Sequence, residues 1–126
     1  MVVHDKNTGL AIGYYSSKII TYVGSSSGGT GSCVTANLSS NTWYHIVVVK
    51  TGSTTRDTYI NGVKATPTTN NWWGGDMNKL HIGGRHISGA YAGYTTGKIV
   101  DVRAYATALS AQDILSLYHN SALVDE

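Results

Sequence analysis

The sequence predicts an all-β domain that ends in one short helix, and three observations support this fold class. Charged residues make up 13% of the chain, which holds 15 glycines and 9 tyrosines among many Ser, Thr, Val and Ile residues. This composition favours strands and tight turns. Short apolar stretches alternate with turn residues, and only one stretch, near the C-terminus, has helical spacing. Because the 126 residues contain no linker or repeat, a single domain over residues 1–126 is expected.

The N-terminal third is expected to form three short strands. Two of them lie around Ala11–Tyr15 and Lys18–Val23, with a pair of serines at the turn between them. The low-complexity stretch Ser25–Ser32 is expected to be a loop, and a short strand should follow at Cys33–Ala36. Cys33 is the sole cysteine, which excludes an internal disulfide and favours a small core or loop residue.

The clearest strand is Thr42–Lys50, with the sequence TWYHIVVVK. Its side chains alternate between two faces, and Trp43, His45, Val47 and Val49 share one of them. Because both faces carry large apolar groups, the pattern predicts a central strand covered at least partly on each side. His45 is expected to be a packed structural histidine rather than a catalytic base.

A hairpin is predicted at Asn61-Gly62, because the two central residues of a type I′ turn both need a positive φ. The turn would join strands near Thr58–Ile60 and Val63–Thr66. Pro67 cannot donate to a sheet ladder, so it would end the second strand or lie at a sheet edge.

Two further strands are expected after this hairpin. The first is KLHIGG, residues 79–84, and the second is Gly97–Tyr105. In the second strand, one face would hold Ile99, Asp101, Arg103 and Tyr105, and the other Val100, Val102 and Ala104.

The one predicted helix begins after Ser110. Ser110 has the position of an N-cap and Asp113 that of the third helical residue of a capping box. Leu109 and Ile114 have the spacing of a hydrophobic staple. The following apolar residues recur at helical spacing, so one face of the helix should pack on the sheet, and the helix should end near Asn120.

Four motifs occur in a fixed order between Thr42 and Tyr118: NTWYHIVVVKTG, TYINGVKA, KLHIGG and GKIVDVRAYATALSAQDILSLY. This succession resembles the laminin G-like domains of the concanavalin A-like lectin/glucanase superfamily. The resemblance implies an antiparallel β-sandwich of jelly-roll type and a core position for Trp43. Family members usually begin with another strand or two that often contain Phe, whereas this chain has no Phe. The domain is therefore expected to lack the first strand or strands, or to borrow one from a neighbour.

An enzyme is not expected. Glucanases of this fold use a pair of carboxylates, one as acid and one as nucleophile or base. Here the only glutamate is Glu126, and no two aspartates form a close pair on one strand. The aspartates are Asp5, Asp57, Asp76, Asp101, Asp113 and Asp125. The sequence also lacks a phosphate-binding loop and a nucleophile elbow.

No cofactor is expected to be required, but the sequence offers two candidate metal sites. The resemblance implies a structural calcium at Asp101, and Asp76 is a second candidate because calcium prefers oxygen ligands. An exposed ion pair between Asp101 and Arg103 explains Asp101 equally well. His81 and His86 flank a turn, and ordinary polar strand-end residues are a better interpretation than a metal pair.

The stretch NNWWGGD carries the candidate ligand site. Trp72 and Trp73 are consecutive, so in an extended segment one indole points away from the core. An exposed indole beside amides and a carboxylate has the chemistry of a carbohydrate site. The alternative is that both indoles cover a sheet end or a subunit interface. The candidate ligand-binding residues are Asn70, Asn71, Trp72, Trp73, Asp76, Tyr91 and Tyr94.

These observations predict a non-catalytic recognition or adhesion module that binds a glycan or cell-surface polysaccharide. The alternative is a structural module, such as a capsid-decorating, tail or fibre domain of a virus or phage. A homo-oligomer, or docking on a larger assembly, is expected at the extracellular or virion surface, with export through a parent protein because no signal peptide opens the sequence. A net charge of +2 and the lack of a long apolar run argue against nucleic-acid binding and membrane insertion.

Overall fold

The computed structural model describes residues 9–15, 18–25, 28–34, 38–52, 55–69, 82–83, 85–87, 90–92 and 96–121. These residues form three antiparallel sheets and one helix, α1 (Ala111–His119). The four-stranded sheet has the order β1 (Gly9–Tyr15), β2 (Lys18–Ser25), β3 (Gly28–Val34) and β7 (Pro67–Thr69). The three-stranded sheet contains β4 (Ile46–Lys50), β5 (Arg56–Ile60) and β6 (Val63–Lys64), and the two-stranded sheet contains β8 (Arg85–Ile87) and β9 (Ala90–Ala92).

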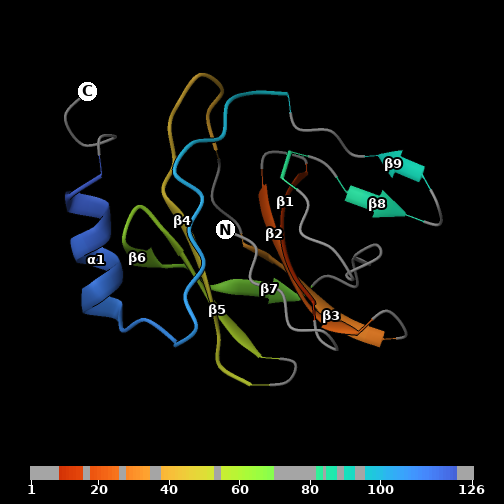
Figure 1. The fold of residues 1–126 in the computed structure, drawn as a ribbon, viewed down its shortest axis with the longest axis horizontal. Coiled ribbons are helices and arrows are strands. Elements are labelled where there is room, and N and C mark those ends of the chain that lie inside the picture. Colours follow the sequence, from red (N-terminus) through yellow and green to blue (C-terminus); the bar gives the residue numbers. More distant parts are fainter. Residues whose placement is uncertain are drawn as a thin grey trace.

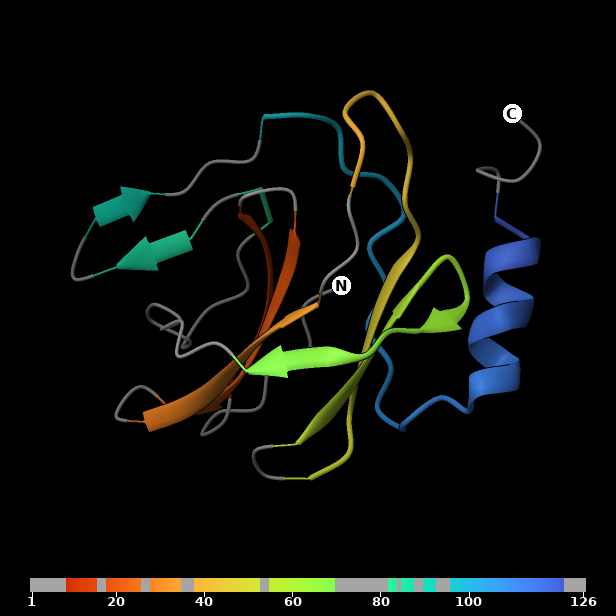
Figure 2. The ribbon, with the colours of Figure 1, turned by 180° about the vertical axis from the view of Figure 1, so that it is seen from behind.

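The three-stranded sheet lies between α1 and the four-stranded sheet (Figures 1 and 2). Its α1-facing side chains form the described core, where Val47 and Val49 of β4 pack with Tyr59 and with Ile114 of α1. Leu109 packs against this cluster from the residue before the N-cap. Ile114 is fully buried, and burial of such a side chain contributes about 1.5–3 kcal/mol.

The opposite face of the same sheet is buried against β2. Val48 and its cross-strand partner Thr58 are both buried on this face. The Thr58 hydroxyl lies 3.3 Å from the hydroxyl of Thr21 on β2. β4 carries buried side chains on both faces, so the predicted cover on each side is confirmed. Its predicted central position is not, because β4 is the first strand in the order of the described three-stranded sheet.

The predicted Asn61-Gly62 hairpin is confirmed between β5 and β6, with positive φ values of 50° and 78°. Asn61 also anchors the start of β4: its backbone N–H donates to the His45 carbonyl at 2.8 Å, and its side-chain oxygen accepts from the His45 N–H at 2.9 Å. A methyl group at Gly62 would lie 2.8 Å from Leu115 Cδ1, so α1 packs directly on this turn. The positive φ favours glycine there, and a larger residue would also have to displace the Leu115 side chain.

The predicted helix is confirmed with its cap. Ser110 Oγ accepts the Asp113 N–H at 3.2 Å, and the Asp113 carboxylate accepts the Ser110 N–H at 3.0 Å. Asn120 terminates the helix as its C-cap. The local pattern was sufficient here because every contact of the capping box lies within four residues.

The loop predicted at Ser25–Ser32 is mostly strand. β2 extends to Ser25 and β3 begins at Gly28, and these two residues are cross-strand partners at the end of the ladder. Glycine and serine have low strand propensity, but pairing with β2 overrides that preference. The first two strands lie where they were predicted, and the strand predicted at Cys33–Ala36 is the end of β3, which stops at Val34.

The strand predicted at Thr42–Lys50 begins later, at Ile46. Asn41 has a positive φ of 57°, and the side chain of Asn61 takes the His45 N–H that a neighbouring strand would otherwise bind. Trp43 precedes the strand and is 38% exposed. The core position that the family resemblance implied for Trp43 is therefore wrong in this chain.

The strand predicted at Gly97–Tyr105 is also wrong, since this segment lies outside every described sheet. Asp101 has a φ of 53°, which interrupts the alternation that a strand needs. Of the strand predicted at residues 79–84, Ile82 and Gly83 form a bend, β8 follows from Arg85, and the other residues lie outside the described ranges. Pro67 begins β7, the last strand of its sheet, which confirms its predicted edge position.

Candidate functional site

The stretch NNWWGGD, which contains five of the candidate ligand-binding residues, lies outside the described residues. Tyr94 lies outside them too. The five are Asn70, Asn71, Trp72, Trp73 and Asp76. The chain enters the stretch from β7, at the edge of the four-stranded sheet, and continues to the β8–β9 hairpin. Both elements lie on the side of the three-stranded sheet away from α1 (Figures 1 and 2). Tyr91 is on β9, opposite His86 of β8.

Asp101, the first calcium candidate, forms an exposed ion pair with Arg103. The Asp101 carboxylate lies 2.7 Å from Arg103 Nε, and this hydrogen bond is the main cause that raises the pKa of Arg103. Among the described residues, no three His, Cys, Asp or Glu side chains gather as a metal site. Asp101 is bound to a guanidinium and has no second acidic ligand within the described ranges, so these residues supply few of the six to eight oxygens that calcium prefers. His81 lies outside the described ranges.

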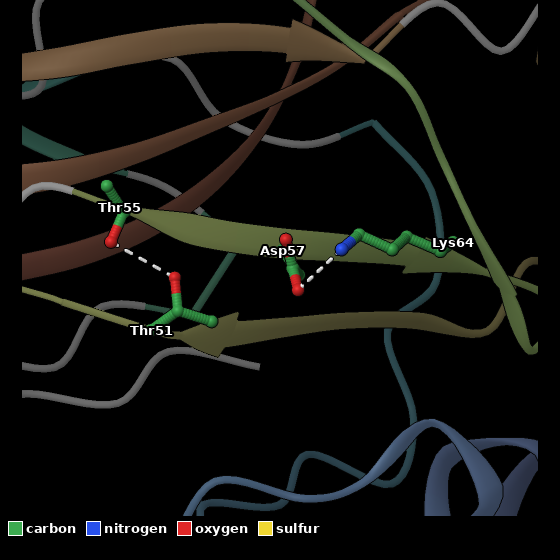
Figure 3. A network of polar contacts seen from close by, with 4 residues as sticks. All are labelled: Thr51, Thr55, Asp57 and Lys64. Carbon is green, nitrogen blue, oxygen red and sulfur yellow. Dashed lines mark hydrogen bonds and ion pairs between the residues drawn. The ribbon is translucent and has the colours of Figure 1, made fainter.

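Asp57 is the second described aspartate, and it is held by Lys64 across the β5–β6 hairpin. Their charged groups are 2.8 Å apart, and the hydrogen bond to Asp57 is the main cause that raises the pKa of Lys64. Figure 3 shows this pair beside the hydrogen bond of 3.1 Å between the hydroxyls of Thr51 and Thr55. The first contact lies in the connection between β4 and β5, and the second joins β5 to β6.

Asp113 is the third described aspartate, and the capping box engages it. Its carboxylate accepts hydrogen bonds from the side chain and backbone of Ser110, and these bonds lower the pKa of Asp113. Each aspartate within the described ranges therefore holds a structural partner. None of them pairs with a second carboxylate in the arrangement that glycoside hydrolysis requires.

His45 lies in a cluster of rings that the sequence did not indicate. Its ring centre is 5.9 Å from that of Tyr118 on α1, and Tyr118 lies 5.5 Å from His119. The Nδ1 atom of His45 is buried and has no hydrogen-bond partner among the described residues. Burial is the main cause that lowers the pKa of His45, and Asp101 acts against it. The predicted structural role agrees with this packing, but the neighbours come from residues far away in the sequence.

No helix in the described ranges is long and apolar enough to cross a membrane. The described residues thus provide a scaffold, three engaged aspartates and a packed histidine. They include no residue arrangement that would hold a reacting sugar between two free carboxylates.

Comparison with known proteins agrees with this architecture. A laminin G family model, described as the concanavalin A-like lectin/glucanases superfamily, matches residues 1–115. The fold is similar to a crystal structure of part of an S-layer domain-containing protein from Clostridium thermocellum, with a TM-score of 0.51 and 24% sequence identity. This similarity covers 94% of the present chain and 61% of the other chain, so the present chain spans less than two thirds of that structure. No curated protein matches the chain.

Proposed function

Because the chain belongs to the concanavalin A-like lectin/glucanase superfamily, we propose that it is a non-catalytic recognition module that binds carbohydrate. Members of this superfamily are lectins, other binding domains and some glucanases. The proposed architecture is the β-sandwich of jelly-roll type that the family implies. The chain would present its binding loops from this framework rather than cleave a sugar.

The engagement of the described aspartates is the observation that carries the non-catalytic part of the proposal. Asp57 pairs with Lys64, Asp101 with Arg103, and Asp113 with the N-cap of α1. A general acid in a glycosidase needs a raised pKa, which comes from burial or from a second carboxylate. Hydrogen bonds lower the pKa of Asp113 instead. The sequence adds a single glutamate, at position 126.

The proposed ligand site is the stretch NNWWGGD, together with the aromatic side chains of Tyr91 and Tyr94. An indole offers an apolar face to the C–H groups of a sugar ring, while amide and carboxylate groups at its rim bind hydroxyls. Asp76 could also hold a calcium ion there, since calcium takes oxygen ligands and both a carboxylate and the hydroxyls of a bound sugar supply them. Neither assignment requires a catalytic group.

A structural role in a surface assembly is the second candidate function. It is supported by the similarity to an S-layer domain-containing protein and by the exposed apolar side chains of Ile99, Val100 and Val102. An S-layer is a surface array, so both candidates would place this chain outside the cell or at a surface. The two functions are compatible, since a recognition module can also be part of an assembly.

A glycan array with the purified chain tests the proposal directly. Binding to at least one polysaccharide is expected, and Trp72→Ala or Trp73→Ala should abolish it while the protein stays folded. Trp43→Ala is the matched control, because it removes the same ring from an exposed position outside the proposed site. Failure to bind any glycan would leave the assembly role as the better function. Release of reducing sugar from a bound glucan would contradict the non-catalytic part.

A further inference from the structure

Residues 97–105, which we name the edge segment, have the composition of a strand but no strand partner among the residues that the structure describes. Their apolar side chains alternate with polar ones, and the exposed fractions of Ile99, Val100 and Val102 are 48%, 57% and 41%. No backbone hydrogen bond joins the edge segment to any other described residue. Unpaired N–H and C=O groups beside exposed β-branched side chains form a template for another strand.

The position of the edge segment leaves it accessible. It follows the course of β4 in both views of the ribbon (Figures 1 and 2), and the charges of Asp101 and Arg103 both influence His45 at the start of β4. Residues 96–104 are all exposed. The apolar groups on both faces of the segment therefore contact solvent rather than the core.

We propose that the edge segment pairs antiparallel with the edge segment of a second copy of this chain, with Val102 on the two-fold axis. A two-fold axis perpendicular to the sheet keeps each side chain on its own face. One residue of the segment must therefore lie directly opposite its own copy, with the axis between the two. With Val102 on the axis, Asp101 lies opposite Arg103 of the second copy, and Arg103 lies opposite Asp101 of the second copy. The remaining cross-strand neighbours are Val100 with Ala104 and Ile99 with Tyr105.

Charge complementarity selects this register and this partner. If Asp101 or Arg103 were on the axis, each would face its own copy, and like charges directly opposite each other destabilise a strand pair. The axis at Val102 is the only one that sets Asp101 opposite Arg103. Since this complementarity is a property of the segment's own sequence, the occupant that fits it is a second copy.

Pairing would exchange the internal ion pair of each chain for an ion pair between the chains, so the number of ion pairs stays at two per dimer. Within a chain, Asp101 and Arg103 are two residues apart, and their ion pair accompanies the φ of 53° at Asp101. A left-handed conformation is unfavourable for a residue with a side chain, although aspartate tolerates it better than most. In the paired strand Asp101 returns to the extended region, and the ion pair re-forms twice across the dimer. The exposed apolar side chains are covered at the same time.

Sedimentation equilibrium of the full chain at low ionic strength tests the proposal. The unaltered chain is expected to dimerise reversibly as its concentration rises. Asp101→Arg and Arg103→Asp each place like charges opposite each other twice, so each variant alone should dimerise about tenfold more weakly. An equimolar mixture of the two variants should restore the dimer, because every cross-strand pair is then opposite in charge while neither chain has an internal ion pair.

Gln112→Arg on α1 is the matched control, since it adds positive charge at an exposed position outside the edge segment and should leave dimerisation unchanged. A second measurement tests the register without any charge change. In a Cys33→Ser background, Val102→Cys should form a disulfide-linked dimer with an added oxidant, because residues directly opposite on antiparallel strands lie within disulfide distance. Val100→Cys, opposite Ala104, should cross-link much more slowly.

The outcomes are decisive in both directions. A monomer at every concentration would overturn the proposal and leave the edge segment to pair within its own chain. A dimer that withstands both charge reversals, or one that cross-links equally through positions 100 and 102, would show that a different surface mediates the contact. Restoration by mixing, together with selective cross-linking through position 102, would establish the antiparallel pair.

Discussion

Arg56 on β5 donates two hydrogen bonds to Thr21 on β2, one from Nε to the hydroxyl at 3.0 Å and one from Nη2 to the backbone carbonyl at 2.9 Å. The Thr21 side chain is fully buried and also contacts the Thr58 hydroxyl. The three-stranded and four-stranded sheets are therefore joined by a polar contact as well as by apolar packing. Burial lowers the pKa of Arg56, and the hydrogen bonds to Thr21 offset the loss of hydration.

Thr21→Val should destabilise the fold by about 1–3 kcal/mol, because it removes the hydroxyl partner of the buried Thr58 side chain and the acceptor of the Arg56 Nε–H. The change in volume is small, so most of the effect should come from the lost hydrogen bonds. The measurement is the free energy of unfolding in urea. Thr55→Val is the matched control: it removes the exposed hydroxyl that contacts Thr51, and it should change stability by less than about 0.5 kcal/mol.

Ser110→Ala should lower the stability by about 1 kcal/mol, the usual effect of losing an N-cap side chain. The variant removes the acceptor of the Asp113 N–H and one donor to the Asp113 carboxylate. Urea unfolding and the helical circular dichroism signal measure the effect. Ser116→Ala, in the same helix, removes only an exposed hydroxyl bonded to the Gln112 carbonyl and should be neutral within about 0.5 kcal/mol. Equal effects of the two variants would contradict the role of the cap.

His45 should make the fold less stable in acid. Burial lowers its pKa in the folded state below 6.5, so the unfolded chain binds the proton more readily. The contribution of His45 to the free energy of unfolding is therefore fully present above pH 6.5, and it is lost as the pH falls from 6.5 through the folded-state pKa. His45→Gln should reduce this pH dependence, as measured by thermal unfolding between about pH 7.5 and 5, the range in which histidine titrates.

His119→Gln is the control for that experiment, because His119 is exposed at the end of α1. It should leave the slope of the melting temperature against pH close to that of the unaltered protein. The same slope in the His45→Gln variant would show that another group controls the acid sensitivity.

Trp72 and Trp73 should behave differently, because successive side chains of an extended segment point in opposite directions. One alanine variant should lose about 3 kcal/mol or more, as expected for a large buried side chain. The other should stay within about 1 kcal/mol of the parent and lose carbohydrate binding. We expect Trp73 to be the exposed residue, since Gly74 and Gly75 free the backbone beside it. Two equally destabilised variants without a binding defect would instead make the pair part of the core.

The strand at Gly97–Tyr105 illustrates why an alternating pattern is insufficient by itself. The pattern reports that a segment can form a strand, but a strand also needs a neighbour that binds its backbone. In the described structure Asp101 adopts a positive φ and binds Arg103, so the segment remains unpaired. Trp43 shows the same limit. Asn61, from a distant turn, binds the backbone of His45, and β4 begins only at Ile46, after the exposed Trp43.

The sequence by itself determined the features whose contacts are local. The Asn61-Gly62 turn, the capping box of Ser110 and Asp113, and the first β-hairpin are each formed by residues close together in the chain, so propensity and spacing were enough. Only the tertiary structure decided that Thr21 meets Arg56, that His45 meets Tyr118, and that the glycine-rich stretch pairs as β3. Those contacts join residues far apart in sequence, and their free energy depends on which surfaces the folded chain brings together.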